Sequence, residues 1–195
     1  MARRYELKRR AERQAETRRR IVEAAIDLHV TVGPARTTLS AIAAKAGVQR
    51  HTLYAHFPEE RDVMNACSGL YMSRNPPPDP ERWSAVADPW DRLAAALGEL
   101  YGWFAANEAM LGNVLRDLEV HPLTREAVER NMGPWHAAAW RALSDGLELS
   151  GRGRAALALA LEFATWRSLV RGSGLATDEA VAVMLAAVRC AGEER

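Results

Sequence analysis

Residues Thr38–Phe57, TLSAIAAKAGVQRHTLYAHF, decide the fold of this chain because they divide into two short amphipathic segments joined at a glycine. In the first segment, apolar residues recur at the i, i+3, i+4 and i+7 spacing of one helix face, at Leu39, Ile42, Ala43 and Ala46. Thr38 is a residue type that caps a helix, and Gly47 is the type that ends one. These residues predict a short helix that packs on a neighbouring helix.

The second segment predicts another short helix, with Leu53 and Phe57 on its inner side. Its outer residues include no acidic side chain and are Gln49, Arg50, His51, Thr52, Tyr54 and His56. In the DNA major groove, Arg reads guanine, Gln reads adenine, and hydroxyl groups reach phosphates. The two segments therefore predict a helix-turn-helix that binds DNA. On spacing alone, an ordinary helical hairpin with a polar outer face is the alternative.

Over about its first third the chain resembles the TetR family of transcriptional repressors. The matching pieces are IVEAAIDLHVTVG (Ile21–Gly33), the TT, IA and AGV residues of Thr37–Val48, TLYAHF (Thr52–Phe57) and Pro58. The order AGV, four residues, LY-x-HF is the specific part. The resemblance implies an all-α fold, with an N-terminal three-helix DNA-binding head that contains the helix-turn-helix. A larger C-terminal helical domain for ligand binding and dimerisation would follow.

The resemblance also implies which residues meet DNA. The second helix of the motif would enter the major groove, with Arg50, His51 and Thr52 at or near the bases. Thr52, Tyr54 and His56 would contact phosphates. The full predicted DNA-binding set is Thr38, Lys45, Gln49, Arg50, His51, Thr52, Tyr54, His56 and Arg61.

Two residues depart from the family pattern. Gln49 stands where the family usually has Ser, so either the cap of the recognition helix is weaker or Gln49 itself reaches toward a base. Glu60 stands where a Lys usually holds a phosphate at the start of the fourth helix, which puts that contact in doubt. Lys45 or Arg61 could supply the missing charge, although neither occupies the matching position.

Charge is distributed unevenly along the chain. The 195 residues have a net charge of +1, but residues 1–62 carry 13 Lys or Arg against 8 Asp or Glu, and residues 63–195 carry 13 against 17. A basic head with a mildly acidic body fits a protein that meets phosphates at one end.

The first twenty residues carry nine Lys or Arg and three Glu. The Glu residues lie three or four places from basic residues, which supports a helix that extends the first helix toward the N-terminus. The segment could instead be a loose arm. A basic arm adds salt-sensitive phosphate contacts or reaches into a minor groove, and a solvated tail is the alternative.

The sequence NPPPDP at residues 75–80 is the one strong linker signal. It predicts a basic arm over residues 1–16, a TetR-type helix-turn-helix domain over residues 17–75, and an effector-binding and dimerisation domain over residues 76–195. Further helices are expected over residues 58–74, beginning at Pro58, and then over residues 90–107, 108–120, 123–149, 152–171 and 177–191.

The last two predicted helices contain the broadly apolar stretches at residues 156–170 and 180–188. Their apolar surface is wider than one buried stripe requires, which predicts a homodimer through these helices, as the resemblance also implies. Burial within a monomer is the alternative. In a dimer, two recognition helices about 34 Å apart would read a palindromic operator.

All six tryptophans lie beyond the predicted head. Most aromatic side chains form core, but the resemblance places a small hydrophobic or aromatic effector of unknown identity in an apolar pocket of the body. Arg116 is a further candidate residue that could orient the polar end of the effector. The predicted lining is Trp103, Phe104, Met110, Asn113, Val114, Asp117, His121, Trp135 and Trp166.

Together these observations predict a ligand-responsive transcriptional regulator, a repressor released from double-stranded DNA by its effector. No HExxH, GxSxG or P-loop motif is present, so we expect no enzyme, cofactor or metal site. A helical protein-binding adaptor is the runner-up, followed by an enzyme. Cys67 and Cys190 are expected as buried thiols. No apolar run approaches the ~20 residues that span a bilayer, so a cytoplasmic protein without a membrane partner is expected.

Overall fold

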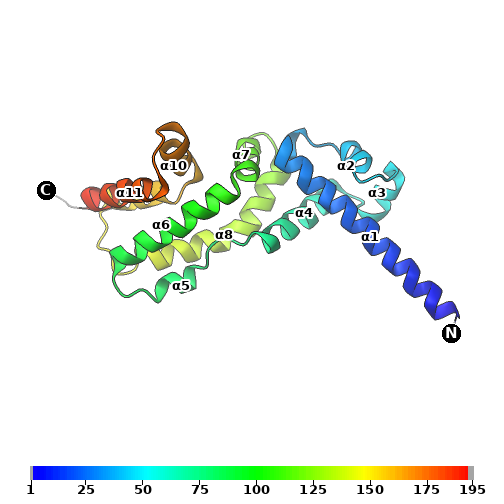
Figure 1. Ribbon diagram of the computed structural model, residues 1–195, viewed down its shortest axis with the longest axis horizontal. Helices are drawn as coiled ribbons and strands as arrows, with labels where there is room; N and C mark the ends of the chain where they lie inside the picture. The colour runs from blue at the N-terminus through cyan, green and yellow to red at the C-terminus, as the bar shows by residue number, and fades with distance from the viewer. Residues whose placement is uncertain (1, 193–195) are drawn as a thin grey trace. The chain divides into compact units, whose positions relative to one another are not determined.

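The computed structural model describes residues 2–192, which form helices and no strand (Figure 1). The elements are α1 (Ala2–Thr31), the 3-10 turn η1 (Pro34–Arg36), α2 (Leu39–Lys45), α3 (Arg50–His56), α4 (Glu60–Arg74), α5 (Pro80–Ser84), α6 (Pro89–Ala106), α7 (Glu108–Asp117), α8 (Pro122–Ser144), α9 (Gly151–Ala160), α10 (Phe163–Arg167), the π-helical turn η2 (Ser168–Gly172) and α11 (Thr177–Gly192). The predicted all-α fold is confirmed. No described helix is both long enough and apolar enough to cross a membrane.

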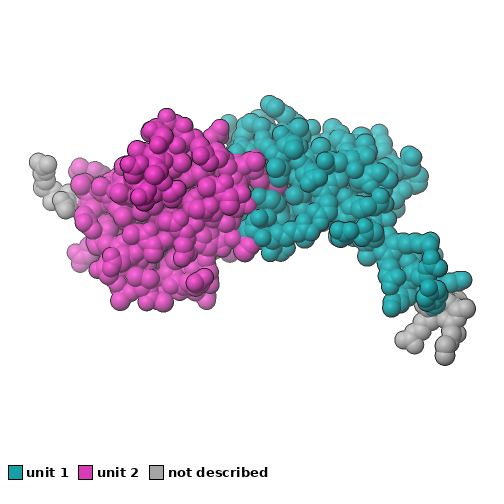
Figure 2. All heavy atoms as spheres, viewed as in Figure 1, with its two compact units in different colours: residues 1–75, 112–131 teal, residues 76–111, 132–195 magenta. Residues whose placement is uncertain are grey.

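The chain divides into two compact units. Unit 1 contains the residues up to Asn75 together with Gly112–Asn131, and unit 2 contains Pro76–Leu111 and the residues from Met132 onward (Figure 2, teal and magenta). Helices α7 and α8 contribute residues to both units. Residues 112–131, which the linker signal assigns to the C-terminal domain, thus group with the head. The functional division into arm, DNA-binding domain and effector domain stays a prediction.

In unit 1, α1 packs against both α2 and α4, and α2 packs against α3. Fully burying a large apolar side chain stabilises a fold by about 1.5–3 kcal/mol, so this cluster fixes the three helices on α1. Its buried apolar members include Ile21, Val22, Ala25, Ile26, Ile42, Ala43, Ala46, Leu53, Phe57, Val63 and Met64. The inner residues predicted for the two segments of the helix-turn-helix are among them, except the half-buried Leu39.

Two glycines make the sharp turns around α2. Gly33, which follows α1, has φ +94°, and Gly47, which follows α2, has φ +66°. Residues with a Cβ rarely adopt such angles, so glycine is favoured at both positions. The expected helix ends at these glycines are confirmed.

Helix α4 begins at Glu60, two residues later than the predicted start at Pro58. The physical reason is a capping box. The Glu59 side chain accepts from the backbone N–H of Asp62, and the Asp62 carboxylate accepts from the backbone N–H of Glu59 at 3.1 Å. Pro58 lies before this cap. The predicted helices ending at residues 120 and 149 are also too long, since α7 ends at Asp117 and α8 at Ser144.

Unit 2 is built on α6, which packs against α11, α5 and α10, while α9 packs on α11. The single helix predicted over residues 152–171 is wrong, because the chain breaks after α9 and resumes at α10. Tyr101 of α6 donates its hydroxyl to the Ala160 carbonyl at 3.0 Å, which satisfies a backbone acceptor at the end of α9. Helix α5 falls in a stretch for which the sequence predicts no helix. Cys67 is buried as expected, but Cys190 is exposed.

Candidate nucleic-acid interface

The turn of the helix-turn-helix is fixed by backbone and side-chain hydrogen bonds. Thr38 accepts from the Ala41 N–H at 3.1 Å, so the predicted N-cap of α2 is confirmed. At the other end of α2, Arg20 donates from Nη1 to the Ala46 carbonyl at 3.1 Å, and Val48 N–H donates to the Ala43 carbonyl at 3.0 Å. Helix α3 therefore leaves the turn in a defined direction.

Helix α3 is anchored by one side and open on the other. Leu53 is 1% exposed and Phe57, its C-cap residue, is 0% exposed. The Arg18 guanidinium lies 4.5 Å from the centre of the Phe57 ring, a cation–π contact that holds the end of α3 on α1. Among the predicted DNA-contacting residues, Gln49, Arg50, His51 and Tyr54 are exposed, and Thr52 and His56 are half-buried.

The outer face of α3 offers donors and acceptors to a partner outside the protein. Arg50 forms no ion pair with any residue that the structure describes. Gln49 is the N-cap residue of α3 but its side chain makes no cap bond. The start of α3 is therefore capped less well than the family pattern implies, and the Gln49 amide is available for an external contact.

The three charged groups around the missing family Lys have partners inside unit 1. Lys45 pairs with Asp27 at 3.3 Å, Arg61 forms a two-point ion pair with Glu126, and the Glu60 carboxylate lies 3.7 Å from His121 Nε2. These side chains are substantially exposed, apart from His121. Exposed ion pairs are worth only about 0–1 kcal/mol, so a phosphate can compete for Lys45 or Arg61. Their roles at DNA stay predictions.

Sequence reasoning missed the side chains that hold residues 112–131 on the head. Asn113 donates from Nδ2 to the carbonyls of His29 and Val30, at 3.2 and 2.6 Å. The Asp117 carboxylate accepts from the Ala35 N–H at 2.9 Å. These three bonds satisfy backbone groups near the end of α1 and in η1. The sequence offers only a general signal for them, namely that a helix end needs polar partners.

The predicted effector-lining residues divide between the two units. Asn113, Val114, Asp117 and His121 belong to unit 1, whereas Trp103, Phe104, Met110, Trp135 and Trp166 belong to unit 2. Arg116 donates to the Asp117 carboxylate at 2.8 Å. Burial alone would raise the pKa of Asp117, but the hydrogen bonds from Arg116 and Ala35 hold it below its ordinary value. Asp117 and Asn113 therefore already have structural roles.

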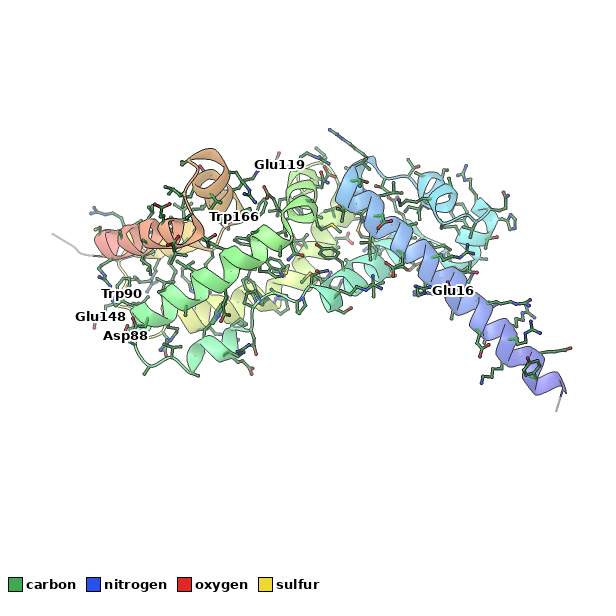
Figure 3. The ribbon with its side chains drawn as sticks, in the orientation of Figure 1. Glu16, Asp88, Trp90, Glu119, Glu148 and Trp166 are labelled. Atoms are coloured by element: carbon green, nitrogen blue, oxygen red, sulfur yellow. The ribbon has the colours of Figure 1, made fainter. Side chains whose placement is uncertain are left out.

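Unit 2 contains an aromatic cluster centred on Phe104. The Phe104 ring lies 5.6 Å from Phe163, 5.8 Å from Trp103 and 6.0 Å from Trp166, between ring centres. Trp166 is 0% exposed, and its Nε1 donor has no hydrogen-bond partner among the described residues (labelled in Figure 3). An unpaired buried donor is unusual in a folded protein.

Trp135, another predicted lining residue, has a different environment. Its Nε1 donates to the Pro78 carbonyl at 2.6 Å, and its ring meets Trp83 edge-on at 6.1 Å. These contacts hold the chain that enters α5. Within the described residues, no group of three or more His, Cys, Asp or Glu side chains is placed to bind a metal ion.

A buried histidine gives unit 1 a predicted pH dependence. His29 is 5% exposed, and burial, aided by repulsion from His121, lowers its pKa to about 4. The unfolded chain, with an ordinary pKa near 6.5, then binds more protons than the folded chain below that pH. Stability is full above pH 6.5 and falls as the pH drops toward 4, by about 3 kcal/mol in total. Urea unfolding at pH 7 and 4.5 should show most of this loss.

The matched variant is His29→Met, because the methionine side chain has a similar volume to histidine but no titratable group. It should lose less stability than the wild type between pH 7 and 4.5. His136 in unit 2 also has a pKa lowered by burial, so a smaller slope should persist. An unchanged slope in His29→Met would show that His29 is not the group responsible.

The geometry of unit 1 is that of a helix-turn-helix DNA-binding protein. The family model "Bacterial regulatory proteins, tetR family" matches residues 21–67. The transcriptional regulator SrpR of Pseudomonas putida is 45% identical over 51 residues, which cover 26% of this chain and 24% of SrpR. The similarity to this curated relative therefore spans about a quarter of its length.

Solved structures resemble the whole fold. PfmR, a TetR family regulator from Thermus thermophilus, superposes with a TM-score of 0.61 at 21% identity, covering 90% of this chain and 99% of PfmR. FadR from Bacillus subtilis, solved in complex with stearoyl-CoA, gives a TM-score of 0.58 at 17% identity, covering 89% and 97%. At these identities the likeness concerns the fold alone. The match of residues 21–67 shows a TetR-type helix-turn-helix head, and the solved structures show that the chain as a whole has the fold of such regulators.

Proposed function

We propose that this chain is a ligand-responsive repressor of the TetR family that binds a palindromic operator as a homodimer. The observation that carries the proposal is the outer face of α3, where guanidinium, amide, imidazole and phenol groups are exposed and no carboxylate is present. Such a face would approach phosphates without repulsion and read base edges in the major groove. Arg50 is the proposed base reader, and Tyr54 a proposed phosphate contact.

Dimerisation is supported by the surface of α9 and α11, which pack on each other in unit 2. Leu159 is 58% exposed and Val183 is 44% exposed. The smaller apolar residues exposed on the same two helices are Ala155, Ala158, Ala182 and Ala186. A monomer gains nothing from exposing this surface, whereas a second copy packed on it would bury it.

The aromatic cluster of unit 2 supports a small hydrophobic or aromatic effector. Because the buried Trp166 Nε1 donor has no partner among the described residues, we expect the effector to carry a hydrogen-bond acceptor. The stearoyl-CoA complex of FadR provides one such molecule to test, with an acyl chain and a thioester carbonyl. The effector would release the protein from DNA by favouring a state in which the distance between the two DNA-binding heads no longer matches the operator half-sites. This release needs no catalytic step.

The experiment is selection of bound duplexes from a random pool by the full-length protein. We expect an enriched palindrome with half-site centres about 10 base pairs apart. A helical adaptor would enrich no sequence and would show weak, salt-labile binding, which would overturn the proposal. On the enriched duplex, stearoyl-CoA and the aromatic probe 1-anilinonaphthalene-8-sulfonate are the first ligands to test for release.

A further inference from the structure

Helix α1 continues well before the part of the chain that matches the TetR family model. The match begins at residue 21, whereas α1 begins at Ala2. Figure 1 shows this first part of α1 running out past α2, α3 and α4, and Figure 3 labels Glu16 on it. Every side chain from Tyr5 to Glu16 is exposed. The segment therefore has no role in the core of unit 1.

The charge of this helical segment does not favour its own helix. Residues 5–20 carry seven Lys or Arg and three Glu, and the first turn of α1 contains no acidic residue. The N-terminal end of a helix has a partial positive charge, so cations there are unfavourable. With neither buried apolar surface nor helpful charge, residues 5–16 gain only local side-chain pairs, such as Lys8–Glu12 at 3.9 Å. An anionic partner would stabilise this segment.

Three arginines define the side of α1 that such a partner would meet. Arg9 and Arg13 lie eleven and seven residues before Arg20, spacings that return to nearly the same side of a helix. Arg20 bonds to the Ala46 carbonyl at the turn between α2 and α3. The Arg9–Arg13 stripe therefore lies on the side of α1 that faces this turn. Among the described residues, no carboxylate pairs with Arg9 or Arg13.

We propose that residues 2–20 form a helical DNA clamp that lies along the duplex beside the half-site read by α3. Arg9 and Arg13 bind phosphates there. This inference rests on the proposed function of α3. At 1.5 Å per residue the segment is about 27 Å long, which corresponds to about 8 base pairs of flanking DNA. The clamp adds affinity and salt dependence without adding sequence preference.

The experiment measures operator affinity against salt concentration for the full-length protein, by fluorescence anisotropy. The duplex is the one selected from the random pool, with about 10 base pairs of flank on each side. The test variant is R9Q/R13Q. The matched control is K8Q/R19Q, which removes two positive charges from another side of the same helix. A third variant, A11P, keeps every charge but breaks the exposed helix.

Each phosphate contact contributes about 0.9 to the slope of log affinity against log salt. R9Q/R13Q should therefore lower the slope by about 1.8 per clamp, or about 3.6 for a dimer with two clamps, so that between 0.05 and 0.2 M salt the wild type loses about 150-fold more affinity than the variant. K8Q/R19Q should change the slope less than half as much. A11P should weaken binding to the flanked duplex, and all variants should keep the wild-type base preference.

Several results would overturn the clamp. Equal slopes for the wild type and R9Q/R13Q would exclude phosphate contacts by the stripe. If R9Q/R13Q and K8Q/R19Q lowered the slope equally, the effect would come from net charge and not from the stripe. If A11P bound the flanked duplex as tightly as the wild type, the segment would not need to be helical to bind. If the wild type selects no sequence at all, the proposed function of α3 fails first. If the wild type binds a selected sequence but R9Q/R13Q has no effect, the clamp is excluded and the proposed function of α3 stands.

Discussion

Gly33→Ala should lower the free energy of unfolding by about 3 kcal/mol or more. At φ +94° and ψ +158°, a conformation that almost only glycine adopts, alanine is strained by about 1–3 kcal/mol. The new Cβ would also overlap the Arg116 guanidinium and the Asp117 carboxylate. Moving Asp117 leaves the Ala35 N–H without its partner, which costs about another 1–3 kcal/mol. Urea unfolding followed by circular dichroism measures the difference.

The matched control is Gly69→Ala, in the middle of α4. No neighbouring atom lies within 4 Å of a Cβ at this position, and the backbone is helical. Alanine should therefore stabilise the chain, by about 0.5–1 kcal/mol. If Gly33→Ala proved as harmless as Gly69→Ala, residues 112–131 would not hold the end of α1 as described.

The double variant L159D/V183D should be monomeric and should bind the selected operator at least about 100-fold more weakly. Charges on the apolar surface of α9 and α11 oppose its burial against a second copy. Two heads in one dimer gain affinity from a high effective concentration, typically by about 10²–10⁴. A monomer loses that gain although α3 is unchanged. Sedimentation velocity and operator titration measure the two effects.

Because both side chains are exposed, L159D/V183D should keep the helical circular dichroism of the wild type. Val120→Asp is the control, since Val120 is an apolar residue with 73% exposure outside α9 and α11. It should leave the assembly state and operator affinity unaltered. A dimeric L159D/V183D protein would contradict the proposed interface.

The parts of the fold that follow local rules could be predicted from the sequence. Thr38 and Gly47 mark the ends of α2, and the spacing of Leu53 and Phe57 orients α3, because capping, turn geometry and helical periodicity depend on neighbours in the chain. The exposed positions of Arg50, His51 and Tyr54 follow from that orientation. The contacts of this set with DNA remain to be measured.

The remaining features depend on contacts between distant segments. The break between α9 and α10 involves the Tyr101 hydroxyl, 59 residues before its partner Ala160. The grouping of residues 112–131 with the head depends on Asn113 and Asp117, which bond to backbone groups about 80 residues earlier. No local pattern reveals such pairs. For the same reason, spacing along the chain could not show that the predicted effector lining divides between the two units.

Reading of base edges by α3 is tested most directly by comparing Arg50→Ala with Tyr54→Phe on the selected operator and on random DNA. Arg50→Ala should weaken operator binding by about 1–3 kcal/mol, roughly 5- to 150-fold, with little loss on random DNA and relaxed preference at one base pair. Tyr54→Phe should weaken binding to both duplexes about evenly. Equal losses of affinity on operator and random DNA for Arg50→Ala would show that Arg50 does not read a base.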